Sequence, residues 1–135
     1  MTADIPLIQH FMTFAPETIQ ADLTLAQARE RMFGLTARHL PVVENGELVG
    51  ILSDRDISLA EALSGDLERL LVRQAMTARP FTCGPGAHLH AVASEMAEHK
   101  YGTAVVVDRD HPGHIVGLFT TTDALRALAR LYGHA

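Results

Sequence analysis

The sequence predicts an α/β protein made of two pseudo-symmetric β-α-β-β-α repeats, at 8–70 and 71–135. The first observation is a duplication, because four identical residues recur 64 positions apart. The second is that each copy alternates short apolar runs with segments of helical periodicity. Two halves of this size are marginal alone, so we expect them to share one body. The duplicated pairs are Met12 and Met76, Thr13 and Thr77, Pro16 and Pro80, and Thr18 and Thr82.

Each repeat is predicted to begin with a short strand, around 18–20 and again around 82–83, and to continue into a helix. Asp22 or Thr24 can cap the first of these helices, because both side chains carry an oxygen acceptor. Gly34 and Gly102 stand near the predicted helix ends, where glycine often terminates a helix. The apolar positions at helical spacing are Leu25, Ala28, Met32 and Leu35, then Leu89, Val92, Ala93, Met96 and Ala97.

A β-hairpin follows each predicted helix. Asn45-Gly46 lies between two apolar runs, which is a strong hairpin signal. The repeat spacing changes from 64 to 67 at the loop 108–114, and length changes collect in loops. Second helices are predicted from Ile57 and from Ala124 onward. A connecting helix at 68–75 is echoed by the segment 6–11 at the N-terminus.

Composition narrows the class of function. The net charge is −5 and no Lys/Arg cluster is present, which disfavours a nucleic-acid partner. The single cysteine, Cys83, excludes an intramolecular disulfide. With no apolar run of membrane length and no signal-like N-terminal segment, we expect a soluble, cytoplasmic protein without a membrane partner.

The end of each hairpin carries a matching polar motif, a hydroxyl residue followed three positions later by Asp, which we call a word. Gly50 is followed by Ser53-x-x-Asp56, and Gly117 is followed by Thr120-x-x-Asp123, at a predicted strand-to-helix transition. A helix N-terminus presents free N–H groups and the positive end of the helix dipole, which suit an anion. The hydroxyl can contact phosphate or ribose, and the carboxylate can accept two hydrogen bonds from a ribose diol. Glycine permits a ligand or a neighbouring backbone to approach closely.

The same words also match a capping box, which closes a helix start without any ligand. For a single copy we would favour that explanation. Two copies, each with glycine three residues before the hydroxyl, favour a binding site, and the two roles can coexist.

In these motifs the chain resembles a tandem pair of CBS domains, also called a Bateman module. The resemblance covers about 8–131. It implies regulation by adenosine ligands such as AMP, ADP, ATP, S-adenosylmethionine or an NAD-like molecule, bound in two clefts between the repeats. The matching words are Met12-Thr13-x-x-Pro16-x-Thr18, His39-Leu40-Pro41-Val42-Val43, Asn45-Gly46-x-Leu48-Val49-Gly50-Ile51, Met76-Thr77, Ala104-Val105-Val106-Val107 and Val116-Gly117-Leu118, with the two hydroxyl-x-x-Asp words.

The resemblance also implies which residues hold the ligand. Asp56 and Asp123 would hold the ribose, and the hydroxyls of Ser53 and Thr120 would lie beside it. The early strands and the approach to the next strand would flank the base. The candidate nucleotide-binding residues are Thr18, Ile19, Arg38, His39, Pro41, Gly50, Ser53, Arg55, Asp56, Thr82, Cys83, Thr103, Ala104, Gly117, Thr120 and Asp123.

The two predicted sites differ in charge. Arg55 lies inside the first word and has Arg38 and His39 nearby, whereas the second word has Thr121 and Thr122. We therefore expect the first site to prefer the more phosphorylated ligand. The second is expected to bind adenosine compounds weakly or to stay empty.

The sequence offers no catalytic set. It contains no nucleophile-base arrangement, no phosphate loop and no metal motif, so we expect neither an enzyme nor a cofactor or metal. His88 and His90 lack the helical spacing of metal ligands. The resemblance implies a homodimer that signals to an unidentified effector protein. The alternative is a structural or protein-interaction module whose clefts bind no ligand.

Overall fold

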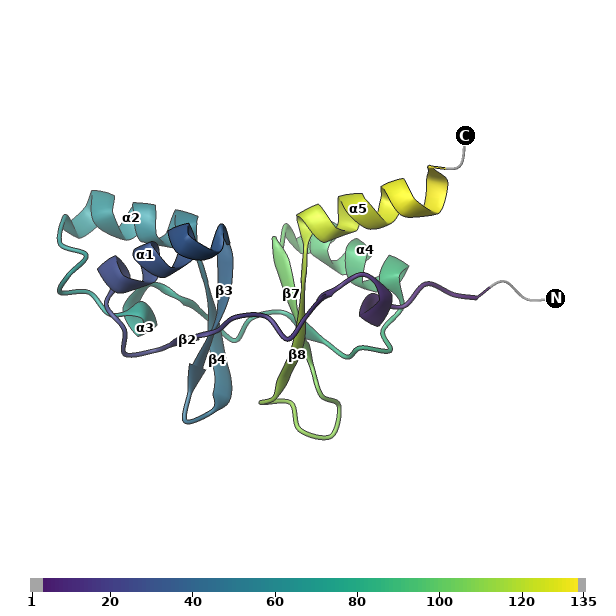
Figure 1. The fold of residues 1–135 in the computed structure, drawn as a ribbon, viewed down its shortest axis with the longest axis horizontal. Coiled ribbons are helices and arrows are strands. Elements are labelled where there is room, and N and C mark those ends of the chain that lie inside the picture. The colour runs from purple at the N-terminus through teal and green to yellow at the C-terminus, as the bar shows by residue number, and fades with distance from the viewer. Residues whose placement is uncertain (1–3, 134–135) are drawn as a thin grey trace. The chain divides into compact units, whose positions relative to one another are not determined.

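The computed structural model describes residues 4–133, which fall into two compact units. One unit is Glu17–Pro80, and the other combines Met1–Pro16 with Phe81–Ala135 (Figure 1). Each unit holds one four-stranded sheet. The predicted α/β class with two repeats is confirmed.

In the Glu17–Pro80 unit the sheet order is β2-β3-β4-β5, with β2 parallel to β3 and the other pairs antiparallel. Helices α1 and α2 cover the same face of this sheet (Figure 1). The elements are β2 (Ile19–Gln20), α1 (Leu25–Leu35), β3 (His39–Glu44), β4 (Glu47–Ser53), α2 (Asp54–Ser64), α3 (Val72–Ala75) and β5 (Thr77–Ala78).

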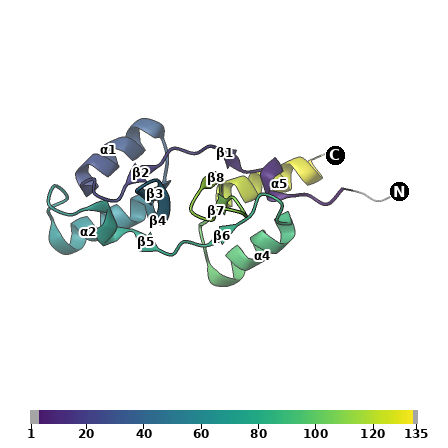
Figure 2. The ribbon, with the colours of Figure 1, turned by 90° about the horizontal axis from the view of Figure 1, so that it is seen from below.

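The other unit repeats this plan, with sheet order β6-β7-β8-β1 (Figure 2). Cys83 pairs with Val106 just as Ile19 pairs with Val42, so the strand register obeys the sequence repeat. The elements are the 3-10 turn η1 (Ile8–His10), β1 (Thr13–Phe14), β6 (Thr82–Cys83), α4 (Leu89–His99), β7 (Thr103–Val107), β8 (Ile115–Thr120) and α5 (Thr121–Tyr132).

The leading segment of each sequence repeat belongs to the other compact unit. Strand β1, from the start of the first repeat, pairs with β8 of the second. Strand β5, from the start of the second repeat, pairs with β4 of the first. The predicted boundaries at 8–70 and 71–135 follow the sequence repeat, whereas the compact units exchange these leading segments.

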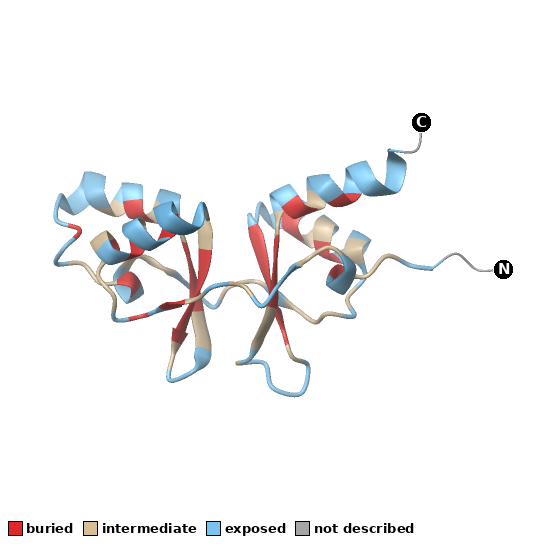
Figure 3. Ribbon diagram, in the orientation of Figure 1, coloured by how far each residue is buried: buried red, intermediate tan, exposed pale blue. Residues whose placement is uncertain are grey.

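Each unit has its own buried core (Figure 3). The same repeat position anchors both cores. Val72 is fully buried in the core of the Glu17–Pro80 unit, together with Leu25, Leu40 and Val42. Ile8, which lies 64 positions earlier, is fully buried in the other core beside Phe119. The exchanged segments are therefore integral parts of the two cores.

Two predicted helix ends are wrong. Gly34 lies inside α1, and the C-terminal cap is Thr36 in the left-handed conformation, with φ 54°. Lys100 ends α4 in the same way with φ 59°, two residues before Gly102. At the start of α1 the prediction is confirmed, since Thr24 forms a capping box with Gln27.

The predicted connecting helix is shorter than expected. Only Val72–Ala75 is helical, because the preceding residues are fixed by tertiary contacts instead. Ala26 N–H donates to the Leu67 carbonyl at 3.0 Å, and Leu25 N–H donates to the Leu70 carbonyl at 2.8 Å. The hairpin prediction holds, since Asn45 and Gly46 both adopt positive φ, at 53° and 76°.

Gly50 and Gly117 allow a methionine and the neighbouring strand to pack closely. A Cβ at Gly50 would lie 2.6 Å from Met76 Sδ and 2.8 Å from the Thr77 carbonyl oxygen. A Cβ at Gly117 would clash with Met12 Sδ in the same way. We expect Gly50→Ala to lower the free energy of unfolding by about 1–3 kcal/mol, the usual cost of overpacking. Chemical denaturation measures this, with the exposed Gly34→Ala as the control.

Candidate functional site

The predicted residues of the first site meet where β3 begins and β4 ends. His39 lies directly opposite Ser53 in the strand register. The N–H of Asp54 donates to the Arg38 carbonyl at 2.9 Å, which ties the start of α2 to the start of β3. The fold therefore brings Arg38, His39 and the Ser53-x-x-Asp56 word together within one unit.

Ser53 and Asp56 form the capping box that we considered as the alternative. The Asp56 N–H donates to Ser53 Oγ at 3.0 Å, and the Ser53 N–H donates to Asp56 Oδ2 at 2.9 Å. The expectation of free N–H groups at this helix start is thus wrong for Asp54 and Asp56, since local acceptors satisfy both. Among the described residues, no donor hydrogen-bonds to Asp56 Oδ1, so that oxygen remains available to a ligand.

Two arginines lie near the Ser53-x-x-Asp56 word, one within it and one just before the facing strand. Arg55 is exposed in the first turn of α2, and Arg38 is exposed just before β3. Asp54 is exposed beside them, so the local charge is mixed. The arrangement offers a carboxylate acceptor with Arg55 next to it in the chain and Arg38 joined to the start of α2 through its carbonyl.

The remaining predicted residues of the first site are mostly packed. The side chain of Ile19 lies in the core, and Pro41 is fully buried. Met76 occupies the space that a side chain at Gly50 would fill, so protein packs against this glycine. Thr18 is partly buried just before β2. Any ligand contact from Ile19 would therefore use its backbone.

The second site repeats the geometry with a different carboxylate environment. Thr103 lies opposite Thr120, and the Thr121 N–H donates to the Gly102 carbonyl at 3.1 Å. Asp123 is only 6% exposed, and its Oδ2 accepts from the Thr120 N–H at 2.9 Å and from the Thr120 hydroxyl at 3.1 Å. Its Oδ1 lies 3.6 Å from Arg126 Nη1.

The other predicted residues of the second site contribute little polarity. Ala104 is fully buried in the core, and Thr82 is exposed on the short strand β6. Cys83 packs against the core, and burial raises the pKa of its thiol to about 11. The thiol is therefore protonated at neutral pH, which agrees with packing and disfavours a nucleophilic role.

The ionisation of His39 in the first site makes the folding stability depend on pH. Burial lowers the pKa of His39 below its ordinary value of 6.5, against the opposing effect of the Asp54 and Asp56 carboxylates. The unfolded chain then binds the proton more readily, so the stability from neutral His39 is present above pH 6.5 and is lost as the pH falls through it. We expect His39→Gln to reduce the loss of stability between pH 7.5 and pH 5.5. Denaturation at the two pH values measures this, and an unchanged loss would contradict it.

A groove that the sequence did not reveal adjoins the first site. It lies between the end of α1 and the start of α2, with a volume of about 600 Å³. The matching groove between α4 and α5 has about 470 Å³, and its lining residues sit at equivalent repeat positions. The first groove is lined by Arg29, Met32, Phe33, Thr36, Ala37, Arg38, Asp54, Ile57 and Ser58.

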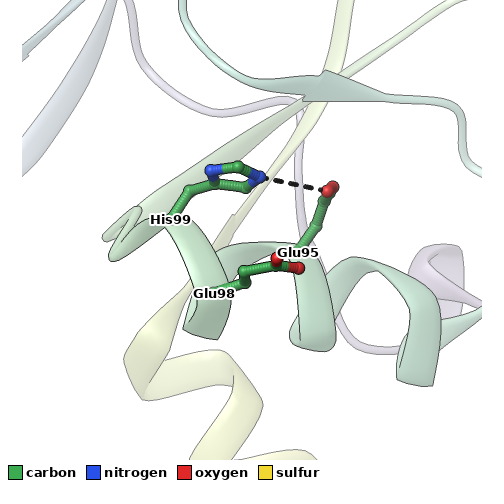
Figure 4. Close-up of side chains that lie close together, drawn as sticks. All are labelled: Glu95, Glu98 and His99. Carbon is green, nitrogen blue, oxygen red and sulfur yellow. Dashed lines mark ion pairs between the residues drawn. The ribbon is translucent and has the colours of Figure 1, made fainter.

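Within residues 4–133, one group of potential metal ligands lies outside both sites, on α4. Side-chain ligand atoms of Glu95, Glu98 and His99 lie within 4.8 Å of one another (Figure 4). Their spacing of three and four residues was a signal that the sequence analysis missed. His99 Nε2 lies 3.3 Å from Glu95 Oε1, so a helical ion pair already accounts for the arrangement.

The comparison with protein families decides between generic α/β repeats and a known module. The family model described as "CBS domain" matches residues 8–62 and again residues 72–130. The chain belongs to the CBS domain family. The two matches coincide with the two sequence repeats and include both hydroxyl-x-x-Asp words.

Curated relatives carry this CBS pair in different settings. The CBS domain-containing protein YhcV of Bacillus subtilis is 29% identical over 111 residues, covering 82% of this chain and 79% of that protein. The L-aspartate semialdehyde sulfurtransferase of Methanosarcina acetivorans is 31% identical over 134 residues, covering 97% of this chain but 25% of the enzyme. This chain thus spans about a quarter of that enzyme's length.

Solved CBS-pair structures share the fold. A Vibrio cholerae protein named for acetoin utilization (AcuB) has a TM-score of 0.83 at 30% identity, with 96% of this chain and 95% of that chain covered. The CBS domain pair of protein MJ0100, in complex with 5′-methylthioadenosine and S-adenosyl-L-methionine, has a TM-score of 0.81 at 25% identity, covering 90% and 98%. CBSX2 in complex with AMP has a TM-score of 0.79 at 25% identity, covering 93% and 98%.

Helices of membrane-spanning length and hydropathy are not found in residues 4–133.

Proposed function

We propose that this CBS pair is a regulatory protein that binds an adenosine-containing nucleotide, with Asp56 as the ribose acceptor. One observation carries the proposal: Asp56 Oδ1 accepts no hydrogen bond within residues 4–133, at a helix start with Arg38, His39 and Arg55 nearby. A carboxylate positioned by a capping box is already oriented for a diol, so little ordering is lost on binding. The AMP and S-adenosyl-L-methionine complexes of related CBS pairs support this ligand class.

The first site is the stronger one in this proposal. Arg55 and Arg38 can hold phosphate oxygens, and charge-assisted hydrogen bonds of this kind are about twice as strong as neutral ones. The second site offers the hydroxyls of Thr121 and Thr122 at the equivalent positions. We therefore expect ATP or ADP to prefer the first site, and uncharged adenosine compounds to distinguish the two sites less.

The proposed output is a ligand-linked change in association. Several large apolar side chains on α2 and α5 are exposed, among them Leu59, Leu63, Leu125 and Leu128. Exposed apolar groups of this number favour burial in a protein interface, and we propose a homodimer that passes the signal to an effector protein in the cytoplasm. A nucleotide that binds one arrangement better shifts its population.

A thermal-shift panel tests the proposed function. The panel contains AMP, ATP and S-adenosylmethionine, with GMP as the control. GMP has the same ribose and single phosphate as AMP but a different base. A ligand at about 100 times its dissociation constant adds roughly 2.7 kcal/mol to the free energy of unfolding. Stabilisation by an adenosine compound beyond GMP is expected. No shift with any of them would overturn the proposal and favour an interaction module.

A further inference from the structure

The two carboxylates proposed to bind ribose, Asp56 and Asp123, differ in what contacts their Oδ1 oxygens. Asp56 Oδ1 accepts no hydrogen bond from the described residues, whereas Asp123 Oδ1 faces Arg126 Nη1 at 3.6 Å. Asp123 Oδ2 already accepts two hydrogen bonds from Thr120, one from its N–H and one from its hydroxyl. Both oxygens of Asp123 therefore have partners before any ligand arrives.

The repeat shows where this difference comes from. Arg126 follows Asp123 by three residues on α5, which places the two side chains on the same face of the helix. The spacing of 67 that relates Asp123 to Asp56 relates Arg126 to Leu59. Leu59 is 60% exposed and carries no charge, so nothing competes for Asp56 from that position.

A vicinal ribose diol needs free acceptor capacity, because it donates two hydrogen bonds to the carboxylate. At Asp56 this capacity exists, and at Asp123 the diol must share or displace the guanidinium of Arg126. We propose that Arg126 restrains the Asp123 carboxylate and so makes the second adenosine site the weaker of the two. This inference rests on the proposed function, since it assumes that the carboxylates receive ribose. Arg126 acts through Asp123 and is a selectivity-determining residue.

The size of the effect follows from exposure. The Arg126 side chain is 73% exposed although the Asp123 side chain is only 7% exposed. Solvent around the guanidinium screens the pair, so we expect a contribution as small as that of surface ion pairs. Removing this one should tighten the second site by about threefold, within the range of roughly 1.5- to fivefold that exposed pairs support. Salt screens exposed pairs, so added salt should reproduce part of the gain when arginine is present.

The experiment is calorimetric titration with adenosine, which has no phosphate to attract Arg126. Asp56→Ala silences the first site, and Arg126→Leu is added to it, since leucine is the residue at the equivalent position 59. We expect adenosine to bind about threefold tighter with Arg126→Leu, and 0.5 M salt to improve binding only while Arg126 is present. The control is Arg69→Leu, which removes an Arg–Asp pair of the same three-residue spacing whose side chains are 88% and 50% exposed. The control should leave adenosine binding unchanged.

The mirror variant tests the same idea at the other site. In an Asp123→Ala background, Leu59→Arg should weaken adenosine at Asp56 by a similar factor. If Arg126→Leu leaves adenosine unchanged but weakens AMP, Arg126 is a phosphate ligand and the inference is overturned. If neither Arg126→Leu nor Leu59→Arg changes the affinity for adenosine, the inference is overturned, even when the wild-type protein binds adenosine. If the wild-type protein binds no adenosine compound, the proposed function itself fails.

Discussion

Replacing Asp56 with alanine should weaken AMP binding by at least about 150-fold, because hydrogen bonds to a charged group contribute roughly 1.5–3 kcal/mol each and a diol makes two of them, about 3 kcal/mol or more. The carboxylate is the acceptor that the capping box orients, since Oδ2 accepts from the Ser53 N–H at 2.9 Å and Oδ1 accepts no hydrogen bond within residues 4–133. Calorimetric titration of AMP measures the loss. Circular dichroism confirms that the variant remains folded.

The capping role of Asp56 needs a separate control. Ser53→Ala removes the hydroxyl that accepts the Asp56 N–H but keeps the carboxylate, so it should cost about 1 kcal/mol of stability and only a modest part of the affinity. Asp123→Ala should have a smaller effect on AMP than Asp56→Ala. The opposite pattern, with Asp123→Ala abolishing binding while Asp56→Ala and Arg55→Ala leave it intact, would contradict the assignment of the sites.

Replacing Ile8 with alanine should lower the free energy of unfolding by about 3 kcal/mol, within the usual range of 2–5 for a large buried aliphatic residue. Ile8 is fully buried beside Phe119, and its N–H donates to the Ala87 carbonyl at 2.9 Å. The variant therefore opens a cavity where the N-terminal segment enters the core of the unit formed with Phe81–Ala135. Urea denaturation followed by circular dichroism measures the change.

Two further variants test whether the exchanged segments stabilise the cores that they enter. Gln9→Ala changes the adjacent exposed side chain and should alter stability by less than about 0.5 kcal/mol. Val72→Ala creates a cavity at the equivalent core position of the other unit and should cost about 1 kcal/mol less than Ile8→Ala, because valine has one methylene fewer. A loss at Ile8 no larger than that at Gln9 would show that the N-terminal segment does not anchor the core.

The repeat made most of the fold predictable from the sequence. The strands, the hairpin at Asn45-Gly46 and the capping residue Thr24 all depend on interactions between residues that are close in the sequence. The capping box at Ser53 and Asp56 was predictable for the same reason. Each of the repeated local patterns also occurs twice with nearly the same spacing, so one copy predicts the elements of the other.

Features set by distant contacts were less predictable. The pairing of β1 with β8 joins residues more than 100 positions apart, and no local pattern encodes it. Gly34 failed as a helix end because α1 continues to Leu35 and Thr36 adopts the left-handed conformation. At the second site, the contact between Arg126 and Asp123 was visible as an i, i+3 spacing, but its meaning required the hydrogen bonds of Thr120 to Asp123.

Mapping the AMP contact by NMR tests the central claim most directly. Amide chemical shifts of the isotope-labelled protein are followed while AMP is added. The account predicts the largest changes at Ser53–Asp56 and at Arg38 and His39, with smaller ones at Thr120–Asp123. Changes confined to the second word, or to surfaces away from both words, would contradict the assignment of Asp56 as the ribose acceptor.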